Sequence, residues 1–100
     1  MQINGLLPVG SVVLLKGSQK RLMIIGVCQQ SGTDEADNHI YDYVGCLFPE
    51  GYMDSTSNFL FDGEQIERLY AIGYQDAEQL AFKEKADELL MQIRNDLEAE

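Results

Sequence analysis

The residue types that could do catalytic or metal chemistry are few in this chain, and their spacing favours neither. His39 is the only histidine, so a metal site built on a pair of histidines is excluded. No G-x-S-x-G turn or comparable setting accompanies it, so a Ser-His-Asp triad is not indicated. We therefore expect His39 to be a hydrogen-bonded or exposed side chain at the start of a strand.

Acidic side chains offer a second kind of chemistry. Asp34, Glu35 and Asp37 are close enough in sequence to bind calcium, but they lack the D-x-D-x-D-G register and distant glutamate of an EF-hand loop. The glycines form neither G-x-G-x-x-G nor G-x-x-x-x-G-K, the usual nucleotide-binding patterns. Any two of the carboxylates could converge as in a glycoside hydrolase, which keeps a hydrolase as a remote alternative. The sequence predicts a protein that is not an enzyme, with no cofactor and no metal site.

The two cysteines, Cys28 and Cys46, are too few and too far apart for a zinc ribbon, and neither belongs to a C-x-x-C pair. Both lie in apolar runs, where a free cysteine behaves as a small hydrophobic residue. We expect two buried, reduced thiols on strands, with a disulfide or redox switch as the alternative.

The charged residues are distributed unevenly along the chain. Every Lys and Arg lies within residues 16–21, at Arg68 or in the C-terminal part, whereas acidic residues continue through the middle, and the net charge is -10. Such an anionic surface repels phosphate backbones and anionic lipid headgroups, so we expect no nucleic-acid binding and no membrane insertion. Lys16, Lys20 and Arg21 are grouped at one turn, where we interpret them as a solubilising cap.

The length and composition are those of one globular domain, residues 1–100. No stretch approaches the roughly 20 apolar residues that span a bilayer. The first residues have neither the charged n-region nor the apolar run of a signal peptide. We expect a cytoplasmic protein.

The elements that must position these residues divide into a strand-rich front, residues 6–73, and a helical back. Apolar, β-branched runs predict strands over residues 7–16, 21–27 and 39–48, with a hairpin turn at 17–20. Residues 58–73 fit either a helical or an alternating period. We favour a turn around residues 62–65 followed by a fourth strand to residue 72. Within the third strand, Asp42 is the one polar intruder, so it should lie at a sheet edge or be hydrogen-bonded.

The last element is an amphipathic helix over residues 76–98, about 30 Å long at 1.5 Å per residue. Asp76 and Gln79 form a capping box at its start, and the apolar side chains recur at three- and four-residue steps: Phe82, Ala86, Leu89, Leu90, Ile93 and Leu97. Either the helix packs on its own sheet, or it overhangs and leaves Ile93 and Leu97 for a partner, or its end frays. The predicted fold is thus α+β: a small antiparallel sheet or partial barrel of about four strands, followed by one long C-terminal helix.

Several of these segments together resemble a known family. The segments are residues 7–17, 22–26, 41–45, 48–51, 59–61 and 73–76, which read LPVGSVVLLKG, LMIIG, YDYVG, FPEG, FLF and GYQD. In order and spacing, over roughly residues 6–82, they look like the family of unknown function numbered 4176, found in Gram-positive bacteria beside genes for LXG-domain toxins and the type VII secretion system. The part of the helix after Phe82 lies outside the resemblance.

The resemblance implies no enzyme, no cofactor and no catalytic residues. It implies an accessory protein, chaperone-like, that binds the helical N-terminal region of an LXG toxin, together with other small helical secretion partners, and helps deliver the toxin for export. An immunity protein that neutralises a basic toxin domain through its acidic surface is the alternative. The candidate partner-binding residues are four aromatic residues of the strand-rich part and three apolar residues from the C-terminal half of the helix: Tyr41, Tyr43, Phe48, Tyr52, Leu89, Ile93 and Leu97. For Tyr43 and Phe48, packing in the core is the competing interpretation.

Overall fold

The computed structural model describes residues 5–30 and 39–98, with side chains through residue 96. The acidic segment with Asp34, Glu35 and Asp37 lies outside the described residues, as does the side chain of Leu97. The described residues form a five-stranded antiparallel sheet followed by one helix, which confirms the α+β prediction. In chain order the elements are β1 (Val12–Leu15), β2 (Leu22–Gln30), β3 (Ile40–Leu47), β4 (Phe59–Phe61), β5 (Ile66–Ala71) and α1 (Ala77–Glu98).

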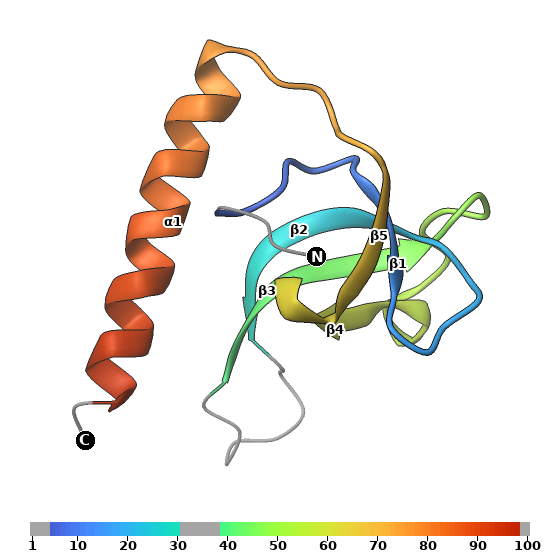
Figure 1. The fold of residues 1–100 in the computed structure, drawn as a ribbon, viewed down its shortest axis with the longest axis horizontal. Helices are drawn as coiled ribbons and strands as arrows, with labels where there is room; N and C mark the ends of the chain where they lie inside the picture. The colour runs from blue at the N-terminus through green and yellow to red at the C-terminus, as the bar shows by residue number, and fades with distance from the viewer. Residues whose placement is uncertain (1–4, 31–38, 99–100) are drawn as a thin grey trace.

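The strands lie in the order β4-β3-β2-β1-β5, so the first and last strands of the chain are neighbours. The sheet is strongly curved and α1 lies beside it, joined to β5 by a single connection (Figure 1). Register shifts accompany the curvature, one between Ile24 and Gly26 in the β2–β3 pair and two in the β1–β5 pair. Such irregularities bend a strand and increase its twist, which lets the sheet wrap around a core.

The first strand begins later than the sequence predicts. Residues 7–11 are not part of β1, because Gly10 has a φ of 96° and Ser11 donates its backbone N–H to the Pro8 carbonyl at 3.2 Å. This turn conformation favours glycine and cannot continue a strand. The prediction of a strand from residue 7 was therefore wrong for its first five positions. Within β1, the successive residues Val12 and Val13 are both buried, as their consecutive apolar character indicates.

The ambiguous segment is resolved in favour of a strand. Residues Gly63–Gln65 form one turn of 3-10 helix, and β5 follows directly, which confirms the predicted turn and the predicted strand. The turn is closed by a capping box, in which Asp62 donates its backbone N–H to Gln65 Oε1 at 2.8 Å. The sequence prediction missed β4, which is three residues long and makes the strands of the described residues five rather than four.

The core lies on the inner side of the curved sheet. Its largest members, fully buried, come one from each of the five strands: Val13, Ile24, Tyr43, Phe61 and Ile66. The rings of Tyr43 and Phe61 pack with centroids 5.4 Å apart, and the Tyr43 hydroxyl accepts a hydrogen bond from the Leu7 N–H at 2.9 Å. Leu6, Leu7, Ala86 and Leu90 join the same cluster, so the segment before β1 connects the core to α1.

Candidate functional site

The helix begins where the sequence predicts. Asp76 precedes α1, and its Oδ1 accepts a hydrogen bond from the Gln79 N–H at 2.8 Å. A complete capping box also needs a hydrogen bond from the Asp76 N–H to the Gln79 side chain. This second bond does not form, since Gln79 Oε1 is buried and has no hydrogen-bond partner among the described residues.

The packing of α1 against the sheet is narrow. Of the side chains described in α1, residues 77–96, only Ala86 and Leu90 are buried. Phe82 is 56% exposed and Leu89 is 53% exposed, although both belong to the predicted apolar stripe. Ile93 is half-buried. The stripe is thus only partly covered by this chain's own sheet.

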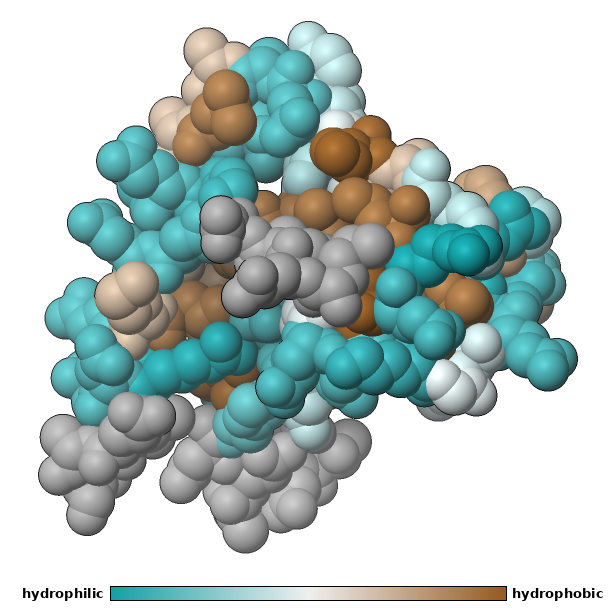
Figure 2. Space-filling view, in the orientation of Figure 1, coloured by the Kyte–Doolittle hydropathy of each residue, from teal (hydrophilic) through white to brown (hydrophobic). Residues whose placement is uncertain are grey.

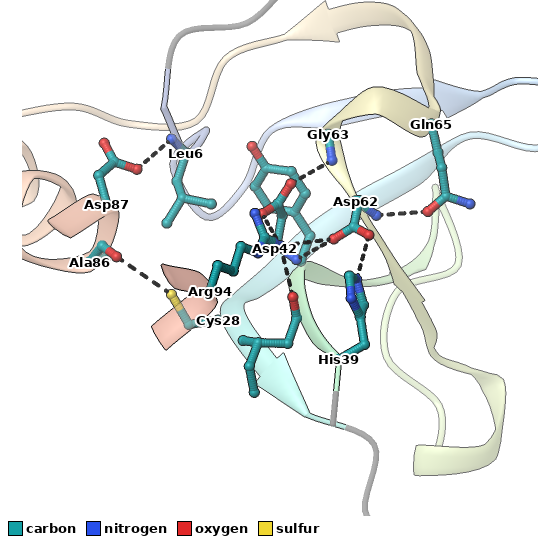
Figure 3. Close-up of polar contacts among 12 residues, drawn as sticks. Leu6, Cys28, His39, Asp42, Asp62, Gly63, Gln65, Ala86, Asp87 and Arg94 are labelled. Atoms are coloured by element: carbon teal, nitrogen blue, oxygen red, sulfur yellow. Dashed lines mark hydrogen bonds and ion pairs between the residues drawn. The ribbon is translucent and has the colours of Figure 1, made fainter. Parts of the chain in front are cut away.

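Polar contacts complete the attachment of the helix near its C-terminal end. Arg94 donates to the Ile40 carbonyl at 2.7 Å and forms ion pairs with Asp42 at 2.9 Å and Asp62 at 3.3 Å (Figure 3). Asp42 also accepts from the Gly63 N–H at 2.7 Å, which confirms that the polar intruder of β3 is hydrogen-bonded. These carboxylates therefore serve to hold α1 and the 3-10 turn against the sheet.

Further contacts fix the middle of the helix. Asp87 accepts from the Leu6 N–H at 2.8 Å and pairs with Lys83 at 2.7 Å, while the Cys28 Sγ lies 3.9 Å from the Ala86 carbonyl oxygen (Figure 3). Cys28 and Cys46 are free thiols on strands; Cys46 is buried and Cys28 partly buried. Burial, and then the negative charges of Asp42 and Asp87, raise the pKa of the Cys28 thiol, with Arg94 acting in the opposite direction.

His39 has the structural setting that the sequence predicts. Its Nε2 lies 2.7 Å from Asp62 Oδ2, and its ring meets Tyr41 edge-on with centroids 4.6 Å apart. Asp62 Oδ1 also accepts from the Asp42 N–H at 2.9 Å. The Asp62 carboxylate is thus occupied by backbone, histidine and Arg94, which is the pattern of a structural network.

A groove opens between α1 and the segment that precedes β1. It has a volume of about 280 Å³, and its walls are mostly apolar: Leu6, Leu7, Pro8, Val9, Val27, Tyr74, Gln79, Phe82, Lys83 and Ala86. Figure 2 shows apolar side chains gathered in the hollow between the helix and the sheet. Val9 is 53% exposed and Tyr74 is 79% exposed, so large apolar and aromatic groups stand at the rim without cover from the described residues.

Ser11 holds two walls of this groove together. It is fully buried; its hydroxyl donates to the Pro8 carbonyl at 2.7 Å and accepts from the Gly73 N–H at 3.0 Å. Gly73 approaches the backbone of Val9 so closely that any side chain there would collide with the Val9 carbonyl oxygen. The close contact requires glycine and places Val9 beside Tyr74, although the two are far apart in sequence.

The predicted partner-binding residues do not form one patch. Tyr43 is 1% exposed, because its ring and hydroxyl are both part of the core. The competing interpretation of core packing is therefore confirmed for Tyr43, and it is not a surface candidate. Tyr41 and Phe48 are half-buried near opposite ends of β3, roughly 23 Å apart at about 3.3 Å per residue. Tyr52 is 61% exposed. None of these four residues lines the groove.

The residues that form the rim of the groove were missed as a site. Val9 was assigned to a strand, and Tyr74 stood out only as part of the GYQD segment. Phe82 was predicted as part of the apolar stripe of the helix. The periodicity alone does not distinguish it from the residues of that stripe that pack against the sheet. Leu89 lies seven residues after Phe82, two turns further along the same side of α1, so it extends the apolar rim along the helix.

The described residues hold neither a metal-binding cluster nor a helix that could cross a membrane. Within residues 5–30 and 39–98, no three His, Cys, Asp or Glu side chains come together in a way that could hold a metal ion. In the same part of the chain, α1 is not apolar enough over its length to cross a membrane.

These features define a small α+β protein with an open antiparallel sheet and an apolar groove beside its single described helix. The chain belongs to a family described as a domain of unknown function, DUF4176, whose model matches residues 6–82. The match begins at Leu6 and ends at Phe82, and both of these residues line the groove. Comparisons with curated proteins and with solved structures found no match.

Proposed function

We propose that this protein is a non-enzymatic adaptor that binds the helical N-terminal region of an LXG toxin in the cytoplasm and targets it for type VII secretion. The observation that carries the proposal is the uncovered apolar groove with Val9, Tyr74 and Phe82 at its rim. The choice of toxin comes from the family resemblance, which implies an accessory role beside LXG toxin genes.

The groove has the properties that helix recognition needs. An amphipathic helix binds through apolar side chains at three-, four- and seven-residue spacing, which insert into an apolar groove. A bulky side chain can enter the hollow, and a neighbouring side chain one or two turns away can contact Leu89 on the outer rim. Gln79 adds one polar side chain to the otherwise mostly apolar walls.

The geometry of α1 supports an adaptor over an enzyme. Its polar contacts hold the helix at a fixed place while leaving one side of it open, so a partner helix can lie against both α1 and residues 6–9. Aromatic anchors at the centre of a contact surface usually supply most of the binding free energy. Phe82 and Tyr74 are the aromatic residues of the groove, and we assign them this role.

Co-purification with the separated halves of the neighbouring LXG toxin tests the proposal. We expect capture by the N-terminal half and a loss of about ten- to hundredfold in affinity for Phe82→Asp, because burying one large apolar side chain contributes about 1.5–3 kcal/mol. Met91→Asp is the matched control: Met91 is 64% exposed, and nine residues at 100° each place it on the opposite side of α1. Equal binding by the two variants, with unchanged circular dichroism, would exclude the groove.

An immunity role is the competing function, and the net charge of -10 is the observation that favours it. In that case the C-terminal half of the toxin would capture the protein, and binding would fall steeply with salt. Apolar binding in the groove instead survives 0.5 M salt, where the Debye length is only about 4–5 Å. Capture confined to the N-terminal half excludes immunity.

A further inference from the structure

A second surface lies at the end of the sheet away from α1. Arg21 is the residue just before β2, at the end of the β1–β2 turn. This turn is far from the helix in Figure 1. Its guanidinium carbon lies 5.0 Å from the centre of the Phe48 ring and 6.0 Å from that of Tyr70. Arg68 of β5 lies 5.8 Å from the same Tyr70 ring. We call these four residues the Arg–Tyr cluster.

Among the described residues, neither arginine of the cluster forms an ion pair, and both are exposed. Glu50 is paired with Lys20 at 2.7 Å. Hydrogen bonding to Lys20, with a smaller contribution from the charge of Arg21, holds the pKa of Glu50 below its usual value. Within the described part of the chain the arginines are thus without an ion pair, although the net charge is -10 and acidic residues are plentiful.

The aromatic rings hold the two guanidinium groups in place and leave the N–H donors of the arginines free. A guanidinium that stacks on a ring keeps its N–H donors free at its edge, where they match both oxygens of a carboxylate. Tyr70 is 47% exposed, so an incoming chain can contact its ring between two fixed cations. We propose that the Arg–Tyr cluster binds a short acidic segment of a second protein.

The surroundings select an acidic protein segment over nucleic acid. Glu50, whose pKa the charge of Arg21 helps to lower, and Glu67, the neighbour of Arg68 in β5, have exposed carboxylates. They repel the continuous run of phosphates in a nucleic acid more strongly than a short segment with few charges. A segment with two or three carboxylates satisfies the two guanidinium groups and leaves the neighbouring acids free. Because β5 is an edge strand of the described sheet, an extended segment can also pair with its backbone, with Arg68 and Tyr70 on one face.

This surface goes beyond the proposed function because it is separate from the groove. None of its four residues lines the groove, so a helical partner beside α1 and an acidic segment beside β5 can bind at the same time. The cluster therefore gives the protein a second binding site of opposite chemistry: charge and aromatic stacking rather than an apolar hollow.

Fluorescence anisotropy with a labelled hexapeptide of alternating glutamate and threonine, which carries three glutamates, tests the proposal at low salt. We expect saturable binding, weakened roughly tenfold or more by Arg68→Gln and also by Arg68→Lys, which keeps the charge but loses the planar fork. Lys85→Gln is the matched control, since Lys85 is an exposed cation on α1 without an ion pair among the described residues, and it should bind as the parent does. Thermal melting followed by circular dichroism checks that each variant is folded.

Four outcomes would overturn the assignment. The first is that the peptide fails to bind. The second is that Lys85→Gln weakens binding as much as Arg68→Gln does, which would mean unspecific charge attraction. A labelled oligothymidylate of the same length binds more tightly than the peptide, which would assign the cluster to nucleic acid. The parent forms a dimer in sedimentation that Arg68→Gln dissociates, which would assign it to a second copy of this chain.

Discussion

The sheet and the helix of this protein are stabilised in different ways. In the sheet, Val13, Ile24, Phe61 and Ile66 have no exposed surface, and apolar packing dominates. In the described part of α1, residues 77–96, only Ala86 and Leu90 are buried, and the contacts that fix the helix are those of Asp87 and Arg94. The sheet thus sets the fold, while a few polar contacts set where the helix lies.

Breaking the sheet should have the largest effect. Phe61→Ala removes a fully buried ring from β4 and should lower the free energy of unfolding by about 3–5 kcal/mol, measured by urea denaturation. Phe59→Ala is the matched control in the same strand, since Phe59 is 46% exposed, and its loss should be well under half as large. Similar losses for the two variants would contradict a core centred on Phe61.

A smaller effect, with a distinctive pH dependence, is expected at Tyr43. Burial raises the pKa of its hydroxyl from the usual 10 to about 12. Between these values the unfolded chain loses this proton while the folded chain keeps it, so stability falls as the pH rises, with a slope of at most about 1.4 kcal/mol per pH unit. Below pH 10 this contribution is fully present.

Tyr43→Phe separates the two roles of that hydroxyl. The variant leaves the Leu7 N–H without its acceptor, which should lower stability at pH 7 by about 1–3 kcal/mol. Because phenylalanine does not ionise, the difference from the parent protein should shrink between pH 10 and pH 12. Denaturation curves at pH 7, 10 and 11.5 measure this, and a difference that stays constant would refute the buried, hydrogen-bonded hydroxyl.

The smallest global effect should come from the helix. Arg94→Ala removes the ion pairs to Asp42 and Asp62, and since the Arg94 side chain is 37% exposed, solvent screening should limit the loss to about 1–2 kcal/mol. Hydrogen exchange should nevertheless accelerate through residues 86–96, while the amides of β2 and β3 remain protected. Equal acceleration in the sheet would show that the two regions unfold as one unit.

The sequence predicts the longer strands and the start of the helix better than it predicts the candidate site. These features depend on residues that are close in sequence, so they can be predicted: the apolar runs that form β2, β3 and β5, and the helix cap at Asp76. β4 was missed because three residues carry too little periodicity. For Tyr43 the sequence left partner binding and core packing both open, because an aromatic residue on a strand can face either side. The groove depends on Ser11 and Gly73, which join segments sixty residues apart, and local patterns do not report such a contact.

The Arg–Tyr cluster shows the same limit. Lys16, Lys20 and Arg21 were interpreted together as a solubilising cap at one turn, yet Arg21 is positioned by Phe48 and Tyr70 from other strands. Arg68 and Tyr70 are neighbours on β5, and only the pairing of β1 with β5 brings this strand close to Arg21 at the β1–β2 turn. Sheet order, which the sequence did not predict, decides which charged side chains share a surface.

The central claim is that the groove beside α1 receives a helix of the toxin, and hydrogen exchange of this protein with and without the toxin's N-terminal half tests it most directly. We predict that binding slows exchange in residues 6–9 and 74–86 and leaves β5 and the β1–β2 turn unchanged. Protection confined to β3, the β1–β2 turn or β5, with none along the groove, would contradict it.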